Sequence, residues 1–173
     1  MSISRQERVK ARVVVVVGVL FASFSSIFIR FSTAPPLIIA FYRMCFASLV
    51  LLPFFLKRRF VEGERISPID ALRMVAGGLF LGIHFATWIT SLSLTSVSSS
   101  VVLVSTHPIL VFFLSMLFFK ERGTVRQFLY IMAAVTGSAI LSYADAGKGE
   151  AVLSGDLLAL TGGMAVGLYL LVG

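Results

Sequence analysis

The chain consists of long apolar runs that are separated by short polar loops. The hydrocarbon core of a bilayer is about 30 Å thick, and a helix rises about 1.5 Å per residue. About 20 residues therefore span it, and shorter runs suffice when flanking side chains snorkel. The pattern predicts an all-α polytopic membrane helix bundle whose six spans are residues 13–29, 37–56, 74–94, 101–119, 128–143 and 157–173.

The loops carry signals for helix ends. Ser67, Pro68 and Asp70 supply an N-cap, an N1 proline and an N3 carboxylate before the third run, and Thr124 and Gln127 do the same before the fifth. On the opposite side, two consecutive prolines at 35–36 separate the first two runs, and the link 94–100 is a very short turn. The third and fourth runs are therefore predicted to form an antiparallel pair.

Glycine pairs at G-x-x-x-G spacing occur in two of the runs. This spacing lets helix backbones approach one another in membranes. It predicts close helix packing at Gly78 and Gly82, and at Gly163 and Gly167.

Composition supports the membrane interpretation. The chain is 58% hydrophobic and 13% charged, with a mean hydropathy of +0.98. That leaves too little polar surface for a soluble domain of 173 residues. The net charge of +7 comes from basic residues at helix ends, which membrane topology explains better than nucleic acid does. We expect the lipid bilayer, and no nucleic acid, as a partner.

Basic residues also predict the orientation. Loops on one side hold four, then five, then three of the fifteen Lys and Arg residues, twelve in all. The opposite side keeps Arg30 and Lys148, and Arg43 lies within a run. The positive-inside rule then places the basic N-terminus, residues 1–12, in the cytoplasm of a multi-pass protein of the inner or plasma membrane. A cleaved signal peptide is disfavoured, because further spans continue the same charge pattern.

Polar side chains within the runs are candidates for a functional site, because they are costly at membrane depth. In the third run they recur at i, i+3, i+4 and i+7, on one helix face. We expect three such stripes to line one cavity: His84, Thr87, Trp88 and Ser91; Ser23, Ser26 and Arg30; and Ser99, Thr106 and His107.

Arg43 is the most distinctive candidate, since it lies six residues inside the second run. An arginine at mid-helix costs about 2.5–3.5 kcal/mol on insertion scales. Either Arg43 faces the cavity with Tyr42 nearby and attracts an anionic group such as a carboxylate, or it bonds backbone carbonyls and snorkels outward.

Three further residues have two interpretations each. His84 either binds substrate or carries a proton, or it is a neutral structural histidine. Trp88 either stacks on a substrate or packs in the core. Pro108, after His107, frees the carbonyl of Val104, which makes either a gating kink or a simple bend.

An enzyme is not expected. The chain contains no G-x-S-x-G, H-E-x-x-H, C-x-x-C or P-loop motif, so no catalytic residues are assigned. Its two histidines and lone Cys45 have no Asp or Glu inside the runs to complete a metal site, and we expect no metal and no cofactor.

Three segments, APPLIIAFYR (34–43), TSVSSSVVLVSTHPILV (95–111) and FFKERGTVRQFLYIMAAVTGSAIL (118–141), resemble the first half of an EamA-type permease of the drug/metabolite transporter superfamily. The resemblance runs from about residue 13 to residue 143. It implies ten helices in two five-helix repeats, and GDLLALTGGMAVGLYLLVG (155–173) resembles the opening of the second. We expect residues 13–154 to form the first repeat and residues 155–173 to begin the second.

Five spans are an odd number, so a second copy would be inverted relative to the first. Inverted repeats are the architecture of alternating access around a midplane site. The chain stops inside the sixth span. We therefore expect it to be a fragment or a truncated gene product; a homodimer could in principle replace the missing half, although an interrupted helix suits this poorly.

The resemblance implies export of a small-molecule substrate, such as an amino acid or related metabolite. Four-helix exporters of this superfamily use an acidic residue in the first helix, where this chain has Ser23, Ser25 and Ser26. Proton antiport through a carboxylate is thus not supported by this half. The alternatives are a nontransporting helix-bundle subunit, whose polar stripes only join helices, or an inactive half-transporter.

Overall fold

The computed structural model describes residues 5–63, 65–118, 124–145 and 150–173, and within these ranges it contains helices and no strand. This confirms the all-α prediction. The elements are α1 (Arg5–Phe31), α2 (Pro36–Leu56), a short π-helical segment η1 (Lys57–Val61), α3 (Pro68–Leu94), α4 (Val97–Val104), α5 (His107–Phe118), α6 (Val125–Asp145) and α7 (Glu150–Val172).

Five spans among the described residues are long and apolar enough to cross a membrane. They are Ala11–Phe31, Pro36–Val61, Pro68–Leu94, Val97–Leu117 and Val152–Val172. The fifth predicted run forms the helix α6, which is not among these five. The sixth span begins at Val152, earlier than residue 157, the start that the sequence suggested.

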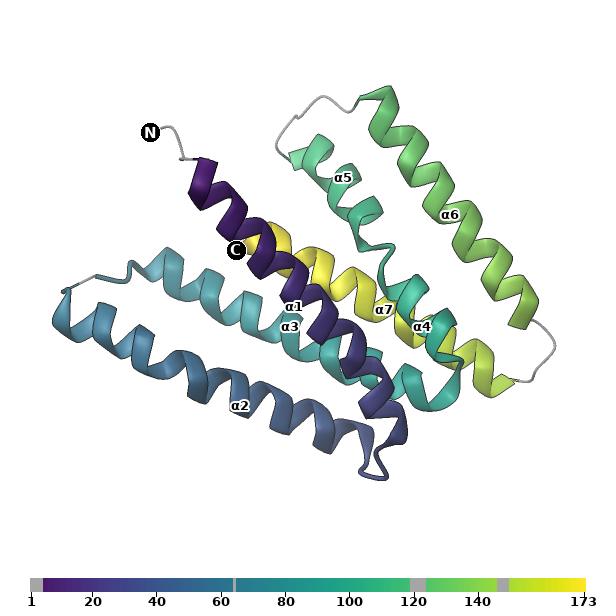
Figure 1. The fold of residues 1–173 in the computed structure, drawn as a ribbon, viewed down its shortest axis with the longest axis horizontal. Helices are drawn as coiled ribbons and strands as arrows, with labels where there is room; N and C mark the ends of the chain where they lie inside the picture. The colour runs from purple at the N-terminus through teal and green to yellow at the C-terminus, as the bar shows by residue number, and fades with distance from the viewer. Residues whose placement is uncertain (1–4, 64, 119–123, 146–149) are drawn as a thin grey trace. The chain divides into compact units, whose positions relative to one another are not determined.

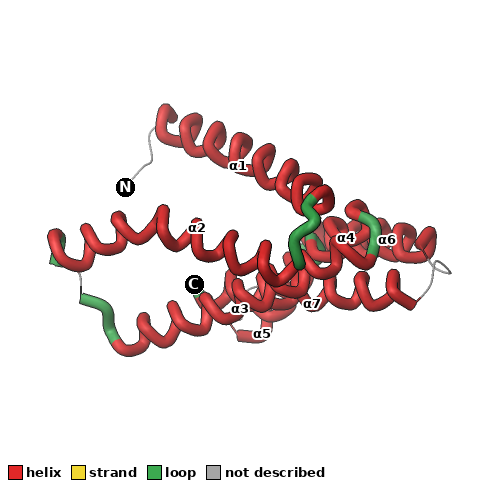
Figure 2. The backbone as a smooth tube through the Cα atoms, turned by 90° about the horizontal axis from the view of Figure 1, so that it is seen from below, coloured by secondary structure: helices red, strands yellow, loops and turns green. Residues whose placement is uncertain are grey.

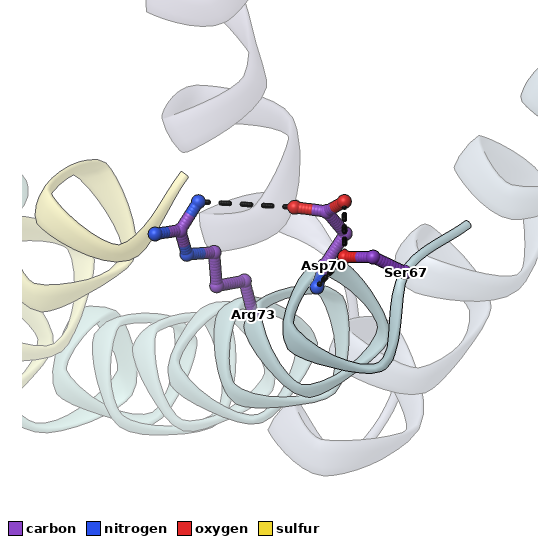
Figure 3. A network of polar contacts seen from close by, with 3 residues as sticks. All are labelled: Ser67, Asp70 and Arg73. Atoms are coloured by element: carbon purple, nitrogen blue, oxygen red, sulfur yellow. Dashed lines mark hydrogen bonds and ion pairs between the residues drawn. The ribbon is translucent and has the colours of Figure 1, made fainter. Parts of the chain in front are cut away.

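The predicted helix starts are confirmed. At the start of α3, the backbone N–H of Asp70 donates to Ser67 Oγ over 3.1 Å, and Ser67 Oγ donates to Asp70 Oδ2 over 2.6 Å (Figure 3). Arg73 Nη1 lies 3.8 Å from the other carboxylate oxygen of Asp70. Before α6, the N–H of Thr124 donates to Gln127 Oε1 over 2.8 Å, and the N–H of Gln127 donates to Thr124 Oγ1 over 3.3 Å. Each pair forms a capping box.

The chain divides into two compact units, residues 1–33 and 34–173. Within the first, α1 stands alone as a helix, and Ser23 donates its hydroxyl to the carbonyl of Val19 over 2.8 Å. The convergence of the Ser23, Ser26 and Arg30 stripe with the others therefore stays a prediction.

Helix α7 occupies the centre of the second unit. It packs most extensively on α3 and also on α4 and α5, while α2 packs on the outer part of α3. Figures 1 and 2 show α3 and α7 side by side, although the two helices are far apart in the sequence. The largest fully buried apolar side chains of this core are Ile89 and Leu92 of α3, and Ala159 of α7 is completely buried.

Glycines on α7 make this close packing possible. A Cβ added at Gly163 would lie 2.9 Å from the carbonyl oxygen of Val104, and one at Gly155 would lie 2.9 Å from the backbone nitrogen of Thr95. At Gly167 it would lie 3.1 Å from Leu110. The backbone at Gly163 and the Leu110 side chain at Gly167 occupy the space that a larger side chain would need, so the prediction of close packing at Gly163 and Gly167 is confirmed.

The corresponding prediction for α3 is not confirmed within the second unit. There, nothing described lies within 4 Å of a Cβ added at Gly78 or Gly82, and it is Gly77 that faces α7, at Tyr169. The spacing of two glycines identifies a helix face that permits approach. It does not identify which helix, if any, comes to that face.

The fourth span is interrupted at Ser105 and Thr106, which separate α4 from α5. Figure 1 shows the two short helices following one another with a bend between them. The helix stops at Val104, four residues before Pro108, as expected from the missing N–H of proline. Only Thr95 and Ser96 separate α3 from α4, which confirms the tight antiparallel connection.

Candidate functional site

Arg43 projects from α2 onto aromatic rings of α3. Its guanidinium carbon lies 4.6 Å from the centre of the Phe85 ring and 5.7 Å from the centre of the Trp88 ring. The side chain is half-buried. A guanidinium over an aromatic face gains about 0.5–2 kcal/mol, more as water is excluded. This contact offsets part of the cost of placing an arginine within the span.

His84 extends the same cluster toward α7. Its ring stacks on Trp88, with centroids 5.7 Å apart and planes inclined by 12°. Its Nδ1 lies 2.8 Å from the carbonyl oxygen of Gly162. Because a carbonyl only accepts, Nδ1 must carry the hydrogen, and in the neutral ring Nε2 is then the acceptor. The contact with Gly162 thereby fixes the tautomer of His84.

Trp88 lies at the centre of this cluster and is 8% exposed. Its indole Nε1 is buried and makes no hydrogen bond with any residue that the structure describes. A buried tryptophan N–H normally finds an acceptor, since an unmade hydrogen bond costs about 1–3 kcal/mol. The indole N–H of Trp88 is therefore a buried donor without an acceptor among the described residues.

These three residues, together with Phe85, form what we call the α2–α3 cluster: Arg43, His84, Phe85 and Trp88. The structure thus brings together three of the residues that the sequence singled out. Phe85 was missed, because a phenylalanine in an apolar run carries no signal of its own. Only the approach of Arg43 from another helix gives its ring a role.

Two other polar residues of the α3 stripe make hydrogen bonds within α3 or to α4. Thr87 donates its hydroxyl to the carbonyl of Ile83 over 2.8 Å. Ser91 lies 2.7 Å from the carbonyl of Trp88 and also contacts the hydroxyl of Ser100 on α4. These hydroxyls bond each other or the backbone beside the cluster, and a role of Thr87 and Ser91 in substrate binding stays a prediction.

Tyr42 does not join the cluster. Its side chain is 54% exposed, and its ring contacts Phe41 and Phe46 of the same helix, with centroids 5.8 and 6.1 Å away. Neighbouring positions on a helix point about 100° apart, which separates Tyr42 from Arg43. The two residues are adjacent in sequence and face different surroundings.

Thr106 and His107 lie at the break between α4 and α5. Thr106 donates its hydroxyl to the carbonyl of Leu103 over 2.7 Å, and His107 Nδ1 lies 3.2 Å from the carbonyl oxygen of Val104. The carbonyl that Pro108 leaves without a backbone donor thus meets a side chain instead. His107 also lines a pocket of about 460 Å³ that contains none of the α2–α3 cluster. One cavity had been predicted, and the candidates fall into two groups.

Asp156 is the polar residue that sequence reasoning missed. It is 8% exposed, and its Oδ1 accepts hydrogen bonds from Thr95 Oγ1 at 2.7 Å and Ser99 Oγ at 3.2 Å. The expectation that the spans hold no carboxylate is therefore wrong, because the sixth span includes Asp156. Sequence reasoning missed Asp156 because it lies one residue before the predicted apolar run, at a position where an acidic side chain usually faces water.

The comparisons with known proteins agree with the resemblance noted above. The sequence model of the EamA-like transporter family matches residues 10–143. A comparison with curated proteins and with solved structures found no match. The matched region contains most of α1, all of α2 to α5 and nearly all of α6, and therefore Arg43, His84 and Trp88.

Proposed function

Because this chain belongs to the EamA-like transporter family, we propose that it exports a small organic metabolite, such as an amino acid, by alternating access. Family membership and the spans make it a multi-pass membrane transporter protein rather than an enzyme. The solute class and the direction of transport are the proposal. We also propose that the protein lies in the inner or plasma membrane and that its N-terminus is cytoplasmic. The distribution of basic residues supports this orientation.

The observation that supports a solute site is the α2–α3 cluster with its unused indole N–H. Arg43 and the Trp88 Nε1–H are both donors, and a carboxylate has acceptor positions for each. Aromatic walls lower the local dielectric, which strengthens any such charge-assisted bond. We propose that the cluster holds the carboxylate of the solute. His84, with Nδ1 bound to Gly162, presents Nε2 as an acceptor.

The fold supports a mechanism in which α7 moves against the other helices. We propose that residues 13–154 form one repeat and that residues 155–173 begin a second, inverted one. In that arrangement α7 belongs to the second repeat, and its glycine contacts with α3 and α4 join the two. Because glycine has no side chain beyond hydrogen, helices in contact at glycines can shift against each other with little obstruction. Such a shift suits a mechanism in which one repeat rocks against the other around a midplane site.

The test is a flux measurement on the protein expressed from its complete reading frame and reconstituted in liposomes. We expect saturable transport of labelled amino acids and none of the matching amino amides, which lack the carboxylate. Arg43→Ala should reduce the flux at least tenfold while membrane abundance stays unchanged. Correctly folded protein with no flux for any amino acid or related metabolite would instead favour the nontransporting helix-bundle subunit.

A further inference from the structure

A pocket that contains none of the α2–α3 cluster residues lies between α5, α6 and α7. Its volume is about 460 Å³, within the range of small-molecule sites. Its walls include Pro108, Val111 and Phe112 of α5, Ile131 of α6 and Leu170 of α7. No Asp, Glu, Lys or Arg is among its lining residues. Among the described lining residues a charged ligand would find no counter-charge, so the chemistry of these walls favours an uncharged one.

Two polar side chains at one end of the pocket have unused hydrogen-bonding capacity. Ser115 makes no hydrogen bond with any described residue, whereas Thr87 and Thr136 bond carbonyls of their own helices. Gln127 uses Oε1 in the capping box with Thr124, and its amide N–H groups are not engaged within the described chain. A ligand head with a hydroxyl group could both donate to Ser115 and accept from Gln127.

At the other end of the pocket, one ring nitrogen of His107 already has a hydrogen-bond partner. There His107 Nδ1 lies 3.2 Å from the carbonyl oxygen of Val104, so that carbonyl needs no ligand. Between His107 and Ser115 the helix rises about 12 Å. Along this length the wall of α5 presents Val111 and Phe112, which suit a hydrocarbon chain.

The surroundings of the pocket are apolar and open. Phe113 and Leu117 of α5 are 52% and 70% exposed, and Leu129 of α6 is 60% exposed. In a membrane protein, large apolar side chains of this kind face lipid or other apolar helices rather than water. The pocket therefore opens onto apolar surroundings, which favours an amphiphile over a water-soluble solute.

We propose that the pocket between α5, α6 and α7 binds one uncharged amphiphile from the bilayer, with its hydroxyl-bearing head at Ser115 and Gln127 and its hydrocarbon chain along Val111 and Phe112. The site is distinct from the α2–α3 cluster in its residues and in its ligand. It does not depend on the proposed transport activity.

Binding is measured on the purified protein in detergent, by native mass spectrometry and by the shift in melting temperature, with 1-oleoylglycerol as the probe. We expect one bound molecule and a rise in melting temperature, and at least tenfold weaker binding of oleate, whose chain is the same and whose head is charged. Val111→Trp should fill the pocket and abolish binding. Leu129→Trp, on a lipid-facing position of α6, should leave binding unchanged.

Ser115→Ala is the second variant, because it adds no volume and threatens the fold least. Loss of one neutral hydrogen bond should weaken binding of 1-oleoylglycerol about fivefold. The proposal fails if oleate binds as tightly as 1-oleoylglycerol, or if neither binds. It also fails if Val111→Trp and Leu129→Trp behave alike, since binding would then be to the general lipid-facing surface.

Discussion

Thr95 donates its hydroxyl hydrogen to Oδ1 of Asp156 over 2.7 Å, and this bond joins the turn after α3 to the first third of α7. Ser99 of α4 donates to the same oxygen over 3.2 Å. Thr95 and Ser99 are both almost completely buried. One carboxylate therefore holds three helices together at one end of the bundle.

Replacing Asp156 with Ala should destabilise the fold. The substitution leaves the buried hydroxyls of Thr95 and Ser99 without their acceptor, at a cost of about 1–3 kcal/mol in the free energy of unfolding. Asp156→Asn retains an acceptor oxygen of similar shape and should cost less. Unfolding by denaturant in detergent micelles measures both.

Ser98→Ala is the matched control for Asp156→Ala, because Ser98 is exposed and adjacent to Ser99. It should change the free energy of unfolding by less than about 0.5 kcal/mol. If Asp156→Ala were as mild as Ser98→Ala, the hydrogen bonds to Asp156 would contribute nothing to joining the helices.

Gly163→Ala should disrupt the contact between α7 and α4. The added Cβ would lie 2.9 Å from the Val104 carbonyl oxygen, and because that atom belongs to the backbone, a helix must shift. Overpacking of this kind costs about 1–3 kcal/mol. Gly78→Ala introduces the same methyl group where no described residue of the second unit lies within 4 Å, so it should cost much less. Equal melting temperatures for the two variants would contradict the close approach.

Trp88→Phe should separate the indole N–H from the aromatic ring. A phenylalanine keeps the ring against Arg43 and His84 but cannot donate, and a hydrogen bond to a charged group contributes about 1.5–3 kcal/mol. We expect the amino acid concentration for half-maximal flux to rise at least tenfold. Tyr42→Phe removes a hydroxyl outside the cluster and should leave this concentration unchanged; a similar effect of both variants would exclude Nε1 as a solute ligand.

Arg43→Lys should show that the shape of the cation matters as well as its charge. Lysine retains the positive charge but loses the planar fork that stacks on rings and binds a carboxylate at two points. We expect a flux well below that of the wild type at equal membrane abundance. Wild-type flux would mean that Arg43 contributes only charge.

Pro108→Ala tests the two interpretations of the interruption between α4 and α5. Alanine restores a backbone N–H that can bond the Val104 carbonyl, so the two helices can join and the melting temperature should not fall. If the interruption is a gating kink, flux should fall. Full flux in a stable variant would identify it as a simple bend.

Local features of the fold could be predicted because they depend on neighbouring residues. The capping boxes at Ser67 and Thr124 and the end of α4 before Pro108 follow from spacings of three or four positions. Span length follows from hydropathy in the same way, although the start of the sixth span was placed several residues late. Hydropathy averages over a window and does not register a single buried carboxylate such as Asp156.

The site could be predicted only in part. Periodicity placed His84 and Trp88 on one face of α3, and the cost of a charge at membrane depth identified Arg43. The same reasoning included Tyr42, which packs on its own helix, and placed His107 in the same cavity. Periodicity along a helix identifies the side chains that share one face. A binding site also needs a second helix opposite that face, and periodicity does not identify that helix.

The sequence by itself determined the helices, where they end and that they belong in a bilayer, because these depend on composition and on spacings of a few residues. Tertiary structure decided which helix faces meet. Gly78 and Gly82 have the same spacing as Gly163 and Gly167, yet among the described residues of the second unit only the α7 pair touches neighbouring helices. The contacts of Arg43 with Phe85 and of Thr95 with Asp156 join residues 42 and 61 positions apart. Such contacts depend on how whole helices pack, which no short pattern contains.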